Sequence, residues 1–126
     1  MVKSQVHDKF KVFVGELGPD KTIGKLADEV AAFASKSQIA AKSIGVEYLE
    51  SAGRLLITLG YRDDAESYPI KLHSVSLGTI DPTAKDFGPL EKAMSEASAK
   101  YRNIICHELY LTSQRDFMMV FMTHEA

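Results

Sequence analysis

The sequence predicts an α+β fold, a mainly antiparallel sheet with two helices on one face. Several short stretches alternate apolar and polar residues, as strands do, and two longer ones carry apolar residues at helical spacing. Along the chain they read strand–helix–strand–strand twice, over residues 9–61 and 70–123. We therefore expect a single domain, residues 1–126, built from two pseudo-repeats that share a pattern and not a sequence. A ferredoxin-like sheet with an extra strand is the alternative.

The first half begins with alternation over residues 9–14, which predicts a strand that Gly15 ends. Asp20 or Thr22 is suited to cap the helix that follows. Its apolar stripe comprises Ile23, Leu26, Ala27, Val30, Phe33 and Ala34. Residues 44–61 then predict a hairpin. In that hairpin Gly45 and Gly60 fall opposite each other, an arrangement that allows a close approach to the backbone.

The second half follows a polar stretch, residues 62–68, which we expect to be a surface loop. A strand over residues 70–80 comes next, and then a second loop over residues 81–88. Pro89 is suited to the first turn of a helix. The apolar stripe of that helix comprises Leu90, Ala93, Met94, Ala97 and Tyr101.

The closing stretch, residues 103–124, predicts two strands that are apolar on both faces and joined by a polar turn. If the turn centres on Gln114 and Arg115, Leu111 pairs with Met118. One face then carries Leu111, Leu109, His107, Met118, Val120 and Met122. The other carries Tyr110, Glu108, Cys106, Phe117, Met119 and Phe121. We expect the first face, which is more aliphatic, to lie against the helices.

The doubled strand–helix–strand–strand order resembles that of the gyrase-inhibitor-like effector-binding domains. The resemblance covers the order of elements over most of the chain and includes no sequence motif. It is a likeness of fold alone.

Composition limits the classes of function. The formal net charge is −2, with acidic and basic residues interspersed, so neither nucleic acid nor an anionic membrane is an expected partner. The single cysteine excludes an intramolecular disulfide framework. The N-terminal residues lack the apolar stretch of a signal peptide, and no stretch has transmembrane length. We therefore expect a cytoplasmic protein.

The aromatic face of the closing hairpin is the candidate site. It places the carboxylate of Glu108 among aromatic and thioether side chains, which are suited to hold a small organic ligand that carries a positive charge. We expect a non-catalytic binding or sensing module without a cofactor. Its predicted ligand-binding residues are Cys106, Glu108, Tyr110, Phe117, Met119 and Phe121.

Two alternatives remain. A homo-oligomeric interaction domain would bury the same apolar face against a second copy, and we expect a homodimer that covers Phe13, Phe117, Met119 and Phe121. A small enzyme using Cys106 or His107 is a remote alternative. Neighbours on a strand point to opposite faces, so these two residues cannot form a catalytic pair with each other. The spacings typical of metal sites are absent, and no metal is expected.

Overall fold

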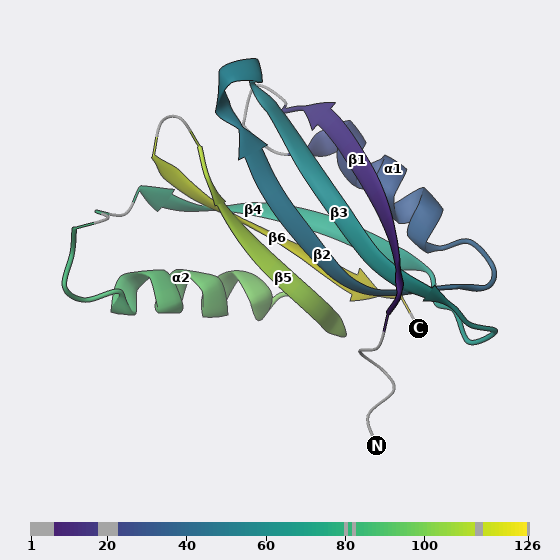
Figure 1. The fold of residues 1–126 in the computed structure, drawn as a ribbon. Helices are drawn as coiled ribbons and strands as arrows, with labels where there is room; N and C mark the ends of the chain where they lie inside the picture. Colours follow the sequence, from purple (N-terminus) through teal and green to yellow (C-terminus); the bar gives the residue numbers. More distant parts are fainter. Residues whose placement is uncertain (1–6, 18–22, 80, 82, 113–114, 126) are drawn as a thin grey trace.

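A computed structural model describes residues 7–17, 23–79, 81, 83–112 and 115–125 (Figure 1). The strands are β1 (Lys9–Glu16), β2 (Ile39–Leu49), β3 (Arg54–Asp63), β4 (Ile70–Thr79), β5 (Ile104–Leu111) and β6 (Asp116–His124). The helices are α1 (Gly24–Ala34) and α2 (Gly88–Ser98), and a short 3-10 turn, η1 (Glu50–Ala52), joins β2 to β3. The predicted α+β class and the doubled strand–helix–strand–strand order are confirmed. The proposed caps, Asp20 and Thr22, lie outside the described residues.

The strands form two antiparallel three-stranded sheets, in the orders β1-β3-β2 and β4-β6-β5. Each half of the chain therefore places its last strand in the middle of its own sheet. The two sheets meet where β2 and β5 lie side by side (Figure 1). No backbone ladder joins these two strands in the described part of the chain.

The main hydrophobic core lies between the inner faces of the two sheets, and α1 packs against it beside β1 and β4. The buried residues of the helix are those predicted from its stripe: Ile23, Leu26, Val30 and Ala34. They meet alternate residues of the two central strands: Leu55, Ile57, Leu59, Met118, Val120 and Met122. Spacings of three and four on the helix and two on the strands bring all of these side chains to one core.

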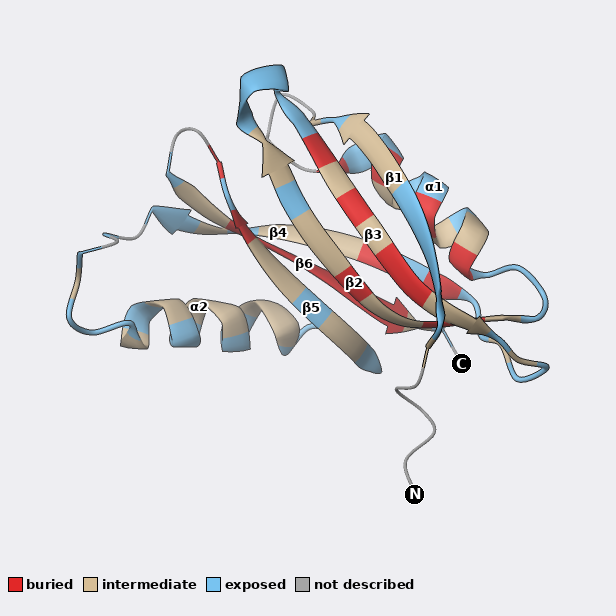
Figure 2. Cartoon of the chain, viewed as in Figure 1, coloured by how far each residue is buried: buried red, intermediate tan, exposed pale blue. Residues whose placement is uncertain are grey.

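Helix α2 lies on the other face of the second sheet, so the prediction that both helices share one face is wrong. Side chains of α2 line a hollow together with Met119 and Phe121, which alternate along β6 with the core residues. As a result β6 is buried on both faces from Met118 to Thr123 (Figure 2). A strand that is apolar on both faces needs cover on both. Here the core that includes α1 covers one face of β6, and the residues beside α2 cover the other.

Gly45 and Gly60 of the first sheet do not pair with each other as predicted. Gly45 lies opposite Thr58, and Gly60 lies opposite Ser43, because the turn between β2 and β3 spans Glu50–Gly53 and makes Leu49 pair with Arg54. The expected close approach does occur at Gly60, where a Cβ atom would lie 2.6 Å from Cδ2 of His7. The absence of a side chain at Gly60 therefore makes room for the imidazole ring.

The closing hairpin differs from the prediction by one residue. Leu111 pairs with Phe117 and not with Met118, because Thr112 pairs with Asp116 across a three-residue loop. Arg115 ends that loop with a φ of 64°, the left-handed conformation typical of three-residue hairpin loops. A slip of one residue exchanges the faces of β6 relative to β5. This change decides where the predicted site residues lie.

Candidate functional site

The register divides the six predicted site residues between the two faces of the second sheet. Cys106, Glu108 and Tyr110 pair with Met122, Val120 and Met118, so they share the face that looks into the core. The other three residues are Phe117, Met119 and Phe121, which alternate with that set and share the face under α2. The predicted constellation of Glu108 with the rings of Phe117 and Phe121 therefore does not form.

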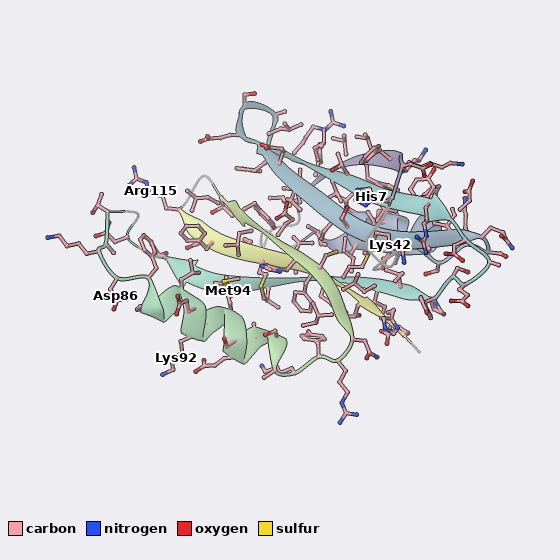
Figure 3. All side chains as sticks on the ribbon, turned by 60° about the horizontal axis from the view of Figure 1, so that its bottom comes forward. His7, Lys42, Asp86, Lys92, Met94 and Arg115 are labelled. Carbon is pink, nitrogen blue, oxygen red and sulfur yellow. The ribbon has the colours of Figure 1, made fainter. Side chains whose placement is uncertain are left out.

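A hollow of about 270 Å³ lies between α2 and the second sheet. We call it the α2 pocket, and it is lined by Met94, Ser95, Ser98, Ile104, His107, Met119 and Phe121. Figure 3 shows Met94 directed from α2 toward the strands and Lys92 directed away. The lining is mainly apolar, with two serines and one imidazole as its polar groups. Apolar walls with a few polar groups are typical of small-molecule pockets.

The pocket exists because α2 packs loosely against the second sheet. No residue of α2 is fully buried, whereas α1 buries Leu26, Val30 and Ala34. Two of the three residues of α2 that line the pocket are serines, Ser95 and Ser98, whose side chains are too short to fill the space above Met119 and Phe121 of β6. The hydroxyl of Ser98 donates to the carbonyl oxygen of Met94, 2.9 Å away, so this polar group is satisfied within the helix. The helix therefore covers the sheet without filling the layer beneath it.

Phe121, one of the lining residues of the pocket, belongs to an aromatic cluster. The rings of His73 and Phe121 stack at 5.1 Å, and Tyr101 meets both, at 4.5 Å and 4.8 Å. Nε2 of His73 is 3.0 Å from the hydroxyl of Thr123. Burial lowers the pKa of His73, Glu125 opposes this shift and Lys71 adds to it. The neutral imidazole is therefore the favoured form within the cluster.

The core-facing half of the predicted set has a different environment. Burial raises the pKa of the Cys106 thiol to about 11, a backbone hydrogen bond from Ile44 opposes the shift, and Glu108 adds to it. A thiol in this state is a poor nucleophile, because the thiolate is the reactive form. Cys106 and His107 point to opposite faces, as predicted.

The described residues contain no group of three or more histidine, cysteine or acidic side chains placed to hold a metal ion. No helix in the described ranges is long and apolar enough to cross a membrane. Met119 and Phe121 are the predicted site residues that line the α2 pocket; Met94, Ile104 and His107 were missed. The signal for Met94 in the sequence is its place in the apolar stripe of a helix that has few large apolar side chains.

Comparison of the chain with models of known protein families, with curated proteins and with solved structures found no match. A proposal of function therefore rests on the side chains of this chain.

Proposed function

We propose that the protein binds a small molecule in the α2 pocket and does not catalyse a reaction there. The observation that carries the proposal is the pairing of an apolar sheet face with a helix that has no fully buried residue. Natural interiors are close-packed, so a partly open apolar layer of this size is unusual unless something enters it. Met94 of α2 and Met119 of β6 both line the pocket, and flexible thioether side chains adapt to ligands of different shape.

The lining favours a ligand with an apolar or aromatic body. Phe121 contributes an aromatic ring to the lining, and His107 is the titratable group among the lining residues. No lining residue that the structure describes is acidic, so this pocket gives no counter-charge to the cationic ligand predicted from Glu108. Glu108 belongs to the opposite face of the sheet.

The test is a thermal-shift and calorimetry series with neutral ligands, 1-decanol and 2-naphthol. A ligand at about 100 times its Kd should raise the free energy of unfolding by about 2.7 kcal/mol. Met94→Trp should fill the pocket and abolish the response, while Lys92→Ala, on the outer side of the same helix, should keep it. If Met94→Trp does not fold, Met94→Ala should enlarge the pocket and change the preference between the two ligands. No response in the wild-type protein, or an equal response in Met94→Trp, contradicts the proposal.

We also propose a homodimer, on an observation that differs from the predicted one. Of the residues expected at the interface, Phe13 packs against Phe33 of α1, and Met119 and Phe121 are buried under α2. The outer face of the first sheet instead exposes Phe10 by 66% and Val12 by 54%. No described helix packs over that face.

A second copy of this chain suits that face. The ring of His7 lies over Gly60 on this face and meets the edge of Phe10. The end of the face at Glu16 carries charges of both signs, Glu16, Glu47 and Arg54. A two-fold contact there would bury the exposed ring of Phe10 and bring together surfaces without an excess of like charge. Light scattering should give the dimer mass for the wild-type protein and for Glu29→Lys on α1, and the monomer mass for Val12→Lys. A wild-type monomer at micromolar concentration contradicts this proposal.

A further inference from the structure

A second hollow adjoins the α2 pocket. It measures about 320 Å³ and is lined by Ala41, Lys42, Tyr68, Asn103, Ile104, Ile105 and His124. Ile104, 38% exposed, lines both hollows, so they meet at this side chain. The second hollow lies at the start of β5, where the two sheets come together. Figure 3 shows Lys42 in this region, far from Arg115 at the other end of the β5–β6 hairpin.

Three irregularities of the backbone converge on this hollow. The pairing of β2 shifts between Ala41 and Ser43, so Lys42 is an extra residue in its strand. The pairing of β5 shifts between Ile104 and Cys106, so Ile105 is extra there. Asn103, which precedes β5, has a φ of 61°. Bulges of this kind redirect side chains and are common next to binding sites.

The bulge at Ile105 joins the two hollows. Ile104 pairs with Thr123, and Cys106 pairs with Met122. These two residues of β5 are two positions apart and would share a face of a regular strand, but here they point to opposite faces. Ile104 therefore lies on the α2 side, whereas Cys106 faces the core. A regular strand would place Ile104 on the core side and separate the two hollows.

The polar groups of the second hollow favour an anion. Lys42 is half-buried, and no ion pair to it is found among the described residues. The pKa of Asp64, the acidic residue that its charge affects, is lowered first by the backbone N–H of Glu66, then by Arg62, and least by Lys42. Arg62 is the partner that binds Asp64, at 2.7 Å. The ammonium group of Lys42 is thus not neutralised by a direct contact.

Asn103 and His124 add hydrogen-bonding capacity beside Lys42. The side-chain amide of Asn103 donates to the carbonyl oxygen of His124 at 3.4 Å, a long bond. Nδ1 of His124 is buried and has no protein partner in the part of the chain that the structure describes. The imidazole ring stacks on Tyr68 with the ring centres 4.8 Å apart. The ammonium group of Lys42 and the second N–H of the Asn103 amide supply hydrogen bonds that a carboxylate accepts, and the ring of His124 lies beside them.

We propose that the two hollows form one site for an amphipathic carboxylate, with its apolar part in the α2 pocket and its carboxylate beside Lys42. This inference rests on the proposed function of the α2 pocket and adds the chemical class of the ligand. The separation of roles follows from the lining: the α2 pocket supplies the apolar contacts, and Lys42 supplies the charge.

The experiment compares three ligands that differ only in their polar end: decanoate, 1-decanol and decylammonium, titrated below their micellar concentrations at pH 7 and fixed salt. Wild-type protein should bind decanoate most tightly. Lys42→Gln should weaken decanoate binding by about tenfold to a hundredfold, the range for a charge-assisted hydrogen bond, and leave 1-decanol unchanged. Lys25→Gln, an exposed lysine of α1, is the matched control and should behave as wild type.

The outcomes separate this inference from the proposed function. Equal binding of decanoate and 1-decanol, or tighter binding of decylammonium, overturns the carboxylate assignment and leaves the α2 pocket as a binding site. Equal weakening by Lys42→Gln and Lys25→Gln also overturns it, because the effect would then be one of overall charge. Binding of none of the three ligands overturns the inference and contradicts the proposed function as well.

Discussion

His73 of β4 stacks on Phe121 of β6, with the ring planes inclined by only 27° and the centres 5.1 Å apart. The contact places a titratable group against the wall of the α2 pocket. Burial, the main cause of the lowered pKa of His73, penalises its protonated form. Protonation of His73 at low pH should therefore destabilise the packing on this face of the second sheet.

Stability should fall as the pH drops below about 6.5, the ordinary pKa of histidine. Because the pKa of His73 is lower in the folded chain, the unfolded chain binds more protons in this window. The contribution of His73 to the free energy of unfolding is complete above its ordinary pKa. It is lost as the pH falls toward the lower pKa of His73 in the folded chain. Urea unfolding at pH 7.5 and 5.0 should show a smaller loss in His73→Phe than in wild type. The same loss in both proteins would assign the effect to other groups.

The two helices should differ in how much they stabilise the fold. Leu26→Ala on α1 removes a side chain that is only 3% exposed and should cost about 2–5 kcal/mol. Leu90→Ala on α2 removes a half-buried one and should cost about 1 kcal/mol. Hydrogen exchange should show α2 opening at a lower free energy than α1. Equal protection of both helices would contradict the loose packing of α2.

Glu108→Gln should leave ligand binding unchanged, because Glu108 lies on the core side of β5 and the α2 pocket on the other. Calorimetry with the ligands described above is the measurement, and Met94→Trp provides the comparison. A loss of affinity in Glu108→Gln without a loss of structure would restore the site predicted around Glu108.

Cys106 should react slowly with iodoacetamide in the folded protein at pH 8, since a thiol with a pKa of about 11 is almost entirely protonated there. The rate should rise sharply in denaturant, where the thiol is exposed. Cys106→Ala should leave ligand binding intact. Rapid alkylation of the folded protein would contradict the inert role assigned to this residue.

Gly60→Ala should destabilise the first sheet by about 1–3 kcal/mol, the cost of forcing extra volume into a packed position. The new Cβ would lie 2.6 Å from the ring of His7 and 2.5 Å from the hydroxyl oxygen of Ser43. A double-mutant cycle with His7→Ala should recover part of the loss. Full additivity would mean that His7 is not the source of the clash.

The sequence by itself determined the elements and most of the core. The stripe of α1 and the alternation of Leu55, Ile57 and Leu59 identify buried faces, because the helical and strand periods leave only one face apolar. On β6 this signal fails, since Met118 to Met122 are apolar at every position. Periodicity then separates two faces without showing which of them meets which helix.

Only the tertiary structure decided how the site is assembled. A three-residue loop at Arg115 sets the pairing of β5 with β6 and so moves Glu108 away from Phe121. Bulges at Lys42 and Ile105 change the direction of nearby side chains, and no residue pattern in either strand predicts them. Strand side chains alternate with a period of two, so one inserted residue exchanges the faces of all that follow. Insertions of this kind depend on packing between strands that are distant in the sequence, which is why the sequence located the apolar face but not the pocket.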